Sequence, residues 1–288
     1  MNTLTMMSVN LEAVTKLSPL VIRILGFNPG IMTLQGTNTY LIGNGSRRIL
    51  LDTGENNKPE YIEALKKVVD EEKAKLAHVI ISHWHLDHIG GLKDVMDNFA
   101  NETTVWKFRR SDAKNKNQFD CVPIKYLTDD QEIQVEGATV RVVHTPGHTT
   151  DHIVLHLKEE NSVFSGDCIL GTGTSVFEDL YDYTKSLEKI LNLDAVILYP
   201  GHGPVVEDVR RKVISYIRHR QTREDQIKDV LNKFKGQNVT TLDIVKALYV
   251  DAPESLYSAA ERNVINHLKK LQKEGLVIEV AKKEWTLK

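Results

Sequence analysis

Short β-rich apolar runs alternate with amphipathic stretches along the chain as far as residue 204. Strands are predicted at residues 21–25, 40–42, 49–51, 79–81, 139–144, 152–157, 162–164 and 196–199. Apolar residues spaced three and four apart predict helices over 59–76 and 182–191. Because strands occur on both sides of helices, this part of the chain is expected to form a layered α/β sandwich.

The pattern changes after residue 204, where helices dominate. Helices are predicted over 206–223, 225–234, 241–249 and 256–274, followed by a hairpin that joins 276–280 to 285–287. Thr240, with Asp243 three residues later, is a typical N-cap for the third of these helices. Helix, helix and hairpin in this order are typical of a winged-helix module. We therefore expect one domain over 1–204 and a helical linker with a winged-helix-like domain over 205–288.

Composition excludes several classes of protein. Hydrophobic residues make up 41% and charged residues 26% of the 288 positions, as in ordinary globular proteins. No apolar run approaches the roughly 20 residues that span a bilayer, so no membrane-embedded segment is expected. Cys121 and Cys168 lie far apart and cannot form a disulfide framework, which favours a reducing compartment.

The net charge of −2 conceals an asymmetry between the two predicted domains. Residues 1–204 hold 20 Lys and Arg against 27 Asp and Glu, whereas residues 205–288 hold 17 against 12. A polyanionic partner is therefore expected to meet the C-terminal part first.

The candidate chemistry is concentrated in residues 82–88, Ser-His-Trp-His-Leu-Asp-His, directly after the strand at 79–81. In an extended segment His83, His85 and Asp87 project to one side, and a turn at Asp87 then brings in His88. Buried imidazoles and a carboxylate without partners carry a desolvation cost that a metal ion removes. Nitrogen and oxygen ligands without thiolates suit an open site for a divalent ion such as zinc.

Three further polar residues complete a possible ligand set. His148, Asp167 and His202 each follow a predicted strand and lie in a glycine-containing turn. Together with the first cluster they supply seven ligands, which is enough for two ions that share one carboxylate. His152 lacks ligand spacing and is expected to be structural.

These motifs resemble the metallo-β-lactamase superfamily over about residues 20–204: His-x-His-x-Asp-His, then Gly-His, Gly-Asp and Gly-His. The resemblance implies a four-layer αβ/βα sandwich that binds two zinc ions. It further implies that the first zinc is held by His83, His85 and His148, and the second by Asp87, His88 and His202. Asp167 would bridge the two ions, and Asp52 would orient the histidine-rich loop without binding metal.

The wording of several motifs is closer to a mitochondrial branch of the superfamily that is related to glyoxalase II and acts as endoribonucleases on single-stranded RNA. The resemblance therefore implies a zinc-dependent endoribonuclease of the mitochondrial matrix, although residues 1–11 hold no acid or base and show no clear presequence. Without mitochondrial import the expected compartment is the cytoplasm. A hydroxide bridging two zinc ions about 3.5–4 Å apart would attack the phosphodiester, and Asp87 would accept its hydrogen bond.

Two alternatives stay open. A metal hydroxide can equally attack a thioester or lactam carbonyl, and hydroxyacylglutathione hydrolases share the Thr-Pro-Gly-His-Thr motif of residues 145–149. They carry a different C-terminal region, built to hold glutathione. A catalytically silent nucleic-acid-binding protein is the other alternative, which the intact ligand set disfavours.

The predicted helix 256–274 is the candidate RNA contact. Apolar residues face inward, and a basic face is expected from His267, Lys269, Lys270 and Lys273. The alternative is that this face packs the module on the body or contacts a protein.

Overall fold

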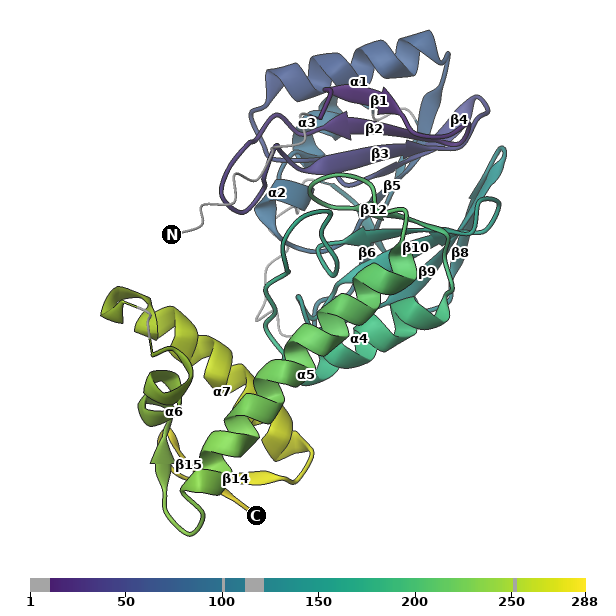
Figure 1. Ribbon diagram of the computed structural model, residues 1–288. Helices are drawn as coiled ribbons and strands as arrows, with labels where there is room; N and C mark the ends of the chain where they lie inside the picture. The colour runs from purple at the N-terminus through teal and green to yellow at the C-terminus, as the bar shows by residue number, and fades with distance from the viewer. Residues whose placement is uncertain (1–10, 100–101, 112–121, 251–252) are drawn as a thin grey trace.

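Two β-sheets lie face to face with helices on both outer sides (Figure 1). The computed structural model describes residues 11–99, 102–111, 122–250 and 253–288. The first sheet has the strand order β1-β2-β3-β4-β5-β6-β7: Val14–Lys16, Val21–Leu25, Asn38–Ile42, Arg47–Leu51, Lys75–Ile81, Thr104–Phe108 and Ile124–Leu127. The second has the order β12-β11-β10-β9-β8: Ile197–Pro200, Ser162–Gly166, Ile153–Leu157, Ala138–His144 and Glu132–Val135.

Alternation of side chains along the buried strands creates the layers. In β4, Ile49 and Leu51 pack against residues of the second sheet, whereas Leu50 points to the opposite face and packs under the helices. The outer face of the first sheet is covered by α1 (Pro59–Glu71) and α3 (Leu92–Phe99), and that of the second by α4 (Leu180–Asn192) and the start of α5 (Val209–Lys233). The predicted four-layer αβ/βα sandwich is confirmed.

Two predicted helix boundaries are wrong. The helix expected over 59–76 ends at Glu71, because Lys73 adopts a left-handed backbone (φ 50°) and Lys75 already begins β5. The two helices expected over 206–223 and 225–234 form the single helix α5. Glu224, in the middle of α5, is buried and paired with Lys270, so tertiary contacts hold the helix together where polar sequence suggested a break.

The C-terminal module consists of α6 (Thr241–Leu248), a 3-10 turn (Glu254–Leu256), α7 (Tyr257–Lys273) and a small sheet. The sheet has the order β13-β15-β14: Val239–Thr240, Glu284–Leu287 and Val277–Ala281. The predicted N-cap is present as a capping box, in which the side chains of Thr240 and Asp243 each accept the other's backbone N–H. This arrangement confirms the winged-helix prediction.

Helix α5 belongs to two cores. Val213 and Tyr216 pack with the second sheet and α4, whereas Ile227 and Leu231 pack with Trp285 and the rest of the C-terminal module (Figure 1). A continuous helix thereby joins the two parts, and the division at residue 204 stays a prediction.

Two sequence predictions concern residues that the structure describes only in part. Cys168 is a free, buried thiol, while Cys121 and residues 1–10 lie outside the described residues. Among the described helices, none combines the length and apolar character needed to cross a bilayer.

Candidate metal centre

All seven predicted ligands lie together at one edge of the two sheets, each just beyond the end of a strand. His83 and His85 follow β5, whereas Asp87 and His88 belong to the short helix α2 (Leu86–Ile89). The remaining three follow strands of the second sheet: His148 after β9, Asp167 after β11 and His202 after β12.

The expectation that the chain stays extended as far as Asp87 is wrong. His85 is the last extended residue (φ −61°, ψ 142°) and caps α2, so that Asp87 and His88 project from a helical turn.

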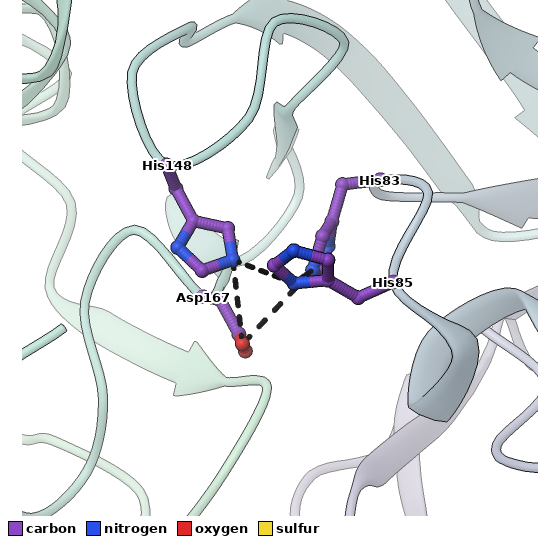
Figure 2. A group of neighbouring side chains, drawn as sticks. All are labelled: His83, His85, His148 and Asp167. Atoms are coloured by element: carbon purple, nitrogen blue, oxygen red, sulfur yellow. Dashed lines mark hydrogen bonds and ion pairs between the residues drawn. The ribbon is translucent and has the colours of Figure 1, made fainter. Parts of the chain in front are cut away.

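The first group of ligands contains His83, His85, His148 and Asp167, which point toward one another in Figure 2. Nδ1 of His85 lies 3.0 Å from Nε2 of His83 and 3.1 Å from Nε2 of His148. The Oδ2 atom of Asp167 is 3.6 Å from Nε2 of His148 and 4.0 Å from Nε2 of His83. Three imidazoles and one carboxylate oxygen therefore surround one point.

The second group contains Asp87, His88 and His202. The Nε2 atoms of the two histidines are 3.3 Å apart, and Oδ2 of Asp87 lies 3.2 Å from the first and 3.1 Å from the second. Oδ1 of Asp167 lies 3.3 Å from both nitrogens. The two oxygens of Asp167 thus face different groups, as a carboxylate shared by two ions requires.

Hydrogen bonds on the outer side of the imidazole rings determine which ring nitrogens face the site with a lone pair. Asp52, at the end of β4, accepts hydrogen bonds from the amide (2.7 Å) and hydroxyl (2.8 Å) of Ser82 and from Nδ1 of His88 (2.7 Å). Because the Ser82 hydroxyl donates to Asp52, its oxygen accepts from Nδ1 of His83 at 3.0 Å. Nε2 of His83 and Nε2 of His88 consequently carry no proton in the neutral imidazoles.

Backbone carbonyls orient two further imidazoles. Nδ1 of His148 donates to the carbonyl of Val176 at 2.8 Å, and Nδ1 of His202 faces the carbonyl of Gly36 at 3.5 Å. Their Nε2 atoms are therefore also lone pairs aimed into the site.

Converging lone pairs repel unless a cation lies between them. A tetrahedral ion with metal–nitrogen bonds of about 2.0–2.1 Å separates its ligand nitrogens by about 3.3–3.4 Å. The observed separations of 3.0–3.3 Å between ligand nitrogens are close to this spacing. The donor set therefore fits a pair of divalent ions of borderline softness.

Burial and charge act differently on the two groups. Burial lowers the pKa of His83, and burial with the neighbouring His148 lowers the pKa of His85 to about 4, so both rings are neutral. In the second group burial opposes the charged ring as well, but the neighbouring aspartates outweigh it. They raise the pKa of His202 to about 9 and that of His88 well above its usual range, so each ring also takes a proton readily at Nε2. A divalent ion would replace that proton, because only the unprotonated nitrogen is a ligand.

His152 is a functional residue that the sequence analysis missed. Its Nε2 accepts the backbone N–H of Asp167 at 3.1 Å, and its Nδ1 donates to the hydroxyl of Thr145 at 2.9 Å. The ring is fully buried and lies against His83, with ring centres 5.2 Å apart. His152 thus fixes the backbone of the bridging aspartate.

The glycine that precedes Asp167 makes this contact possible. Gly166 has a left-handed backbone (φ 47°), and a Cβ there would lie 2.7 Å from Nε2 of His152. Ligand spacing could not have revealed His152. The available signal was sheet pairing, because Thr145 and His152 meet where β9 and β10 begin to pair.

The predicted basic face on α7 is largely absent. His267 and Lys270 are buried, and the Lys270 ammonium pairs with Glu224 (2.6 Å) and Glu274 (2.8 Å). Lys273 is exposed but pairs with Asp179 of the sandwich at 2.6 Å, which leaves Lys269 as the exposed member of the set that forms no ion pair with the described residues. Much of this face is used in packing, because α7 lies against α4 and α5 (Figure 1).

The chain belongs to the metallo-β-lactamase superfamily, whose family model matches residues 32–202. Residues 240–285 match the beta-lactamase associated winged helix domain. The chain is 51% identical to a Beta-lactamase-like protein 2 homolog from Drosophila melanogaster, with 92% of each chain covered. It is 33% identical to an Atrochrysone carboxyl ACP thioesterase from Aspergillus fumigatus, covering 96% of this chain and 89% of that one.

A solved structure extends the likeness to the whole fold. A beta-lactamase domain protein from Burkholderia ambifaria aligns with a TM-score of 0.76 over 96% of this chain and 93% of its own, at 17% identity. At that identity the match shows the shared fold alone.

Proposed function

We propose that the protein is a binuclear zinc endoribonuclease that cleaves phosphodiesters in single-stranded RNA. The observation that carries the two-metal part is Asp167, whose oxygens face the two ligand groups separately. When bound, two adjacent divalent ions supply Lewis-acid activation of water and of a phosphoryl oxygen. Zinc is the proposed metal because the ligands are mainly imidazole nitrogens with carboxylate oxygens.

Hydrogen bonds within the protein orient the predicted metal ligands. Asp52 and the carbonyl of Val176 hold the imidazoles, and the hydroxyl of Thr37 donates to Oδ2 of Asp87 at 3.1 Å. The same Oδ2 atom faces Nε2 of His88 and of His202, so this hydrogen bond orients the oxygen that would bind the second ion. The RNA substrate is supported by the excess of Lys and Arg after residue 204.

A thioesterase is the second candidate, and the observation in its favour is the 33% identity to a relative named as a thioesterase. The same metal centre can activate water against a thioester carbonyl, because the ligand set does not select the electrophile. RNA and thioester therefore have to be compared in one experiment.

The deciding experiment incubates the zinc-loaded full-length protein with labelled single-stranded RNA, double-stranded RNA and S-lactoylglutathione in parallel. Cleavage of single-stranded RNA that Asp167→Asn abolishes is the expected result. Hydrolysis of the thioester with intact RNA would overturn the proposal in favour of the second candidate. A mitochondrial matrix location belongs to the same proposal, and fractionation with protease protection of intact mitochondria tests it.

A further inference from the structure

We infer that the outward face of α5 binds the phosphate backbone of a single-stranded nucleic acid, an inference that rests on the endoribonuclease function proposed above. This face forms a shallow groove that is lined by Asp208, Arg210, Arg211, Arg218, His219 and Thr222, among others. All six of these residues are exposed, and α5 runs from the catalytic sandwich to the C-terminal module (Figure 1).

The N-terminal part of α5 carries charge of one sign. Residues 209–223 contain six Lys and Arg and no Asp or Glu. Three of the six have structural partners: Lys212 donates to the carbonyl of Gly171, Arg220 donates to that of Ser175, and Arg223 lies over the ring of Tyr249. Packing therefore accounts for half of the basic residues.

Packing does not account for Arg210, Arg211 and Arg218. Their side chains make no hydrogen bond or ion pair with any residue that the structure describes. Arg210 and Arg211 also lie in the first helical turn, where the helix dipole is positive. The carboxylate of Asp208 caps this turn by accepting the amide of Arg211 at 3.1 Å, so it is the one acidic group of the groove and the guanidinium groups stay available to a polyanion.

The spacing of the arginines favours a polymer over a single phosphate. Arg211 and Arg218 are seven residues apart, so they lie on the same side of the helix, about 10 Å apart along its axis. This spacing lets the two guanidinium groups contact different phosphates of an extended strand. The C-terminal helix α7 offers no comparable set, because Lys270 and Lys273 are already paired.

The groove is also connected to the metal centre through the segment that follows Asp167. The hydroxyl of Tyr216 in α5 accepts from the amide of Leu170 (3.1 Å) and donates to the carbonyl of Gly173 (2.9 Å). Helix α5 is therefore braced against the loop that carries the bridging carboxylate.

The test removes the three unpaired charges and no other contact. The variant Arg210→Gln/Arg211→Gln/Arg218→Gln is compared with Lys66→Gln/Lys67→Gln/Arg262→Gln, which removes the same charge from exposed positions on α1 and α7. Binding of a fluorescent single-stranded RNA to the full-length protein is measured over a range of salt concentrations. We expect the α5 variant to bind at least about tenfold more weakly. The slope of log affinity against log salt should fall by about 2, from about 0.7 per lost contact.

Activity measurements separate this inference from the proposed function. Both variants should hydrolyse bis(p-nitrophenyl) phosphate as the unmodified protein does, because the metal ligands are untouched. If the α5 variant and the control variant bind RNA equally well, with equal salt slopes, the inference is wrong while RNA cleavage by the unmodified protein still stands. If the unmodified protein hydrolyses only the thioester, the proposed function itself fails.

Discussion

Nε2 of His152 accepts the backbone N–H of Asp167 at 3.1 Å, so this histidine determines where the carboxylate shared by the two ligand groups lies. The contact joins the residue before β10 to the turn after β11, and the hydroxyl of Thr145 orients the ring from its other side. Loss of a group that orients a metal ligand in this way typically lowers metal affinity or activity about 10- to 100-fold.

Replacement of His152 by Ala should therefore weaken metal binding. The substitution leaves the buried amide of Asp167 without an acceptor and frees the carboxylate to move. We expect metal affinity to fall about 10- to 100-fold, as measured by competition with a chelator. His156→Gln is the matched control, because His156 lies on β10, the strand that directly follows His152, but pairs with Asn161. Equal metal affinity in both variants would contradict the positioning role.

Metal content offers the second prediction. The protein as purified with excess zinc should carry close to two ions per chain, because Asp167 faces both ligand groups. Asp167→Asn should bind fewer ions, since a neutral amide is a poorer ligand than a carboxylate. Elemental analysis measures both. A content near one ion that persists after zinc supplementation would be incompatible with the binuclear assignment.

Substitutions of Asp52 and Ser82 should affect the binding of the two ions differently. Asp52 orients His88 directly and His83 through the Ser82 hydroxyl. Asp52→Asn should therefore lower the affinity for both ions, whereas Ser82→Ala should lower chiefly the affinity for the ion near His83. Stepwise titration with zinc distinguishes the two patterns. If Ser82→Ala disturbs both ions equally, the proton chain described for His83 is incorrect.

The ligand set could be predicted from the sequence because each ligand follows a strand end within a short, recognisable motif. His83 and His148 are separated by many residues, yet the shared edge of the sheets brings such turns together (Figure 2). His152 could not be predicted, since its role depends on the pairing of β9 with β10 and on the close approach of Gly166. The β9–β10 hairpin is local in sequence, but the approach of Gly166 from the end of β11 leaves no signal around His152.

In the C-terminal helix α7 the sequence predicted a functional surface that the structure does not have. Lys270 and Lys273 have the spacing of an exposed basic face, but their partners Glu224 and Asp179 come from distant parts of the chain. Periodicity predicts which side of a helix is polar. It does not show whether that side faces water or another helix with complementary charge.

Lys270 should consequently be a stability residue. Lys270→Ala leaves the buried carboxylate of Glu224 with only the longer contact to the partly exposed Lys228 (3.6 Å), and breaking a buried pair costs up to about 3–5 kcal/mol. Lys269→Ala, at the exposed neighbouring position, should change stability by less than about 0.5 kcal/mol. Urea unfolding, followed by the fluorescence of Trp285 in the core of the module, measures the difference. Similar stability of the two variants would show that the pair contributes little.

His267 predicts how the stability of the C-terminal module depends on pH. The ring is buried, and neither nitrogen has a hydrogen-bond partner among the described residues. Burial lowers its pKa to about 3, and the charged groups that face it, Arg220, Arg223 and Lys270, act in the same direction, as does His219.

The unfolded chain binds a proton at His267 near pH 6.5, whereas the folded chain does so only near pH 3. Between these values the unfolded state holds more protons, so stability falls as the pH falls, by about 1.4 kcal/mol per unit. Above pH 6.5 the contribution is constant. The free energy of unfolding of the unmodified protein should therefore fall more between pH 8 and pH 5 than that of the His267→Leu variant. His219→Gln, at an exposed position on α5, should not reduce the fall in this way. Urea unfolding at both pH values provides the comparison. Parallel pH dependence of the His267→Leu variant and the unmodified protein would show that this ring does not stay neutral in the folded chain.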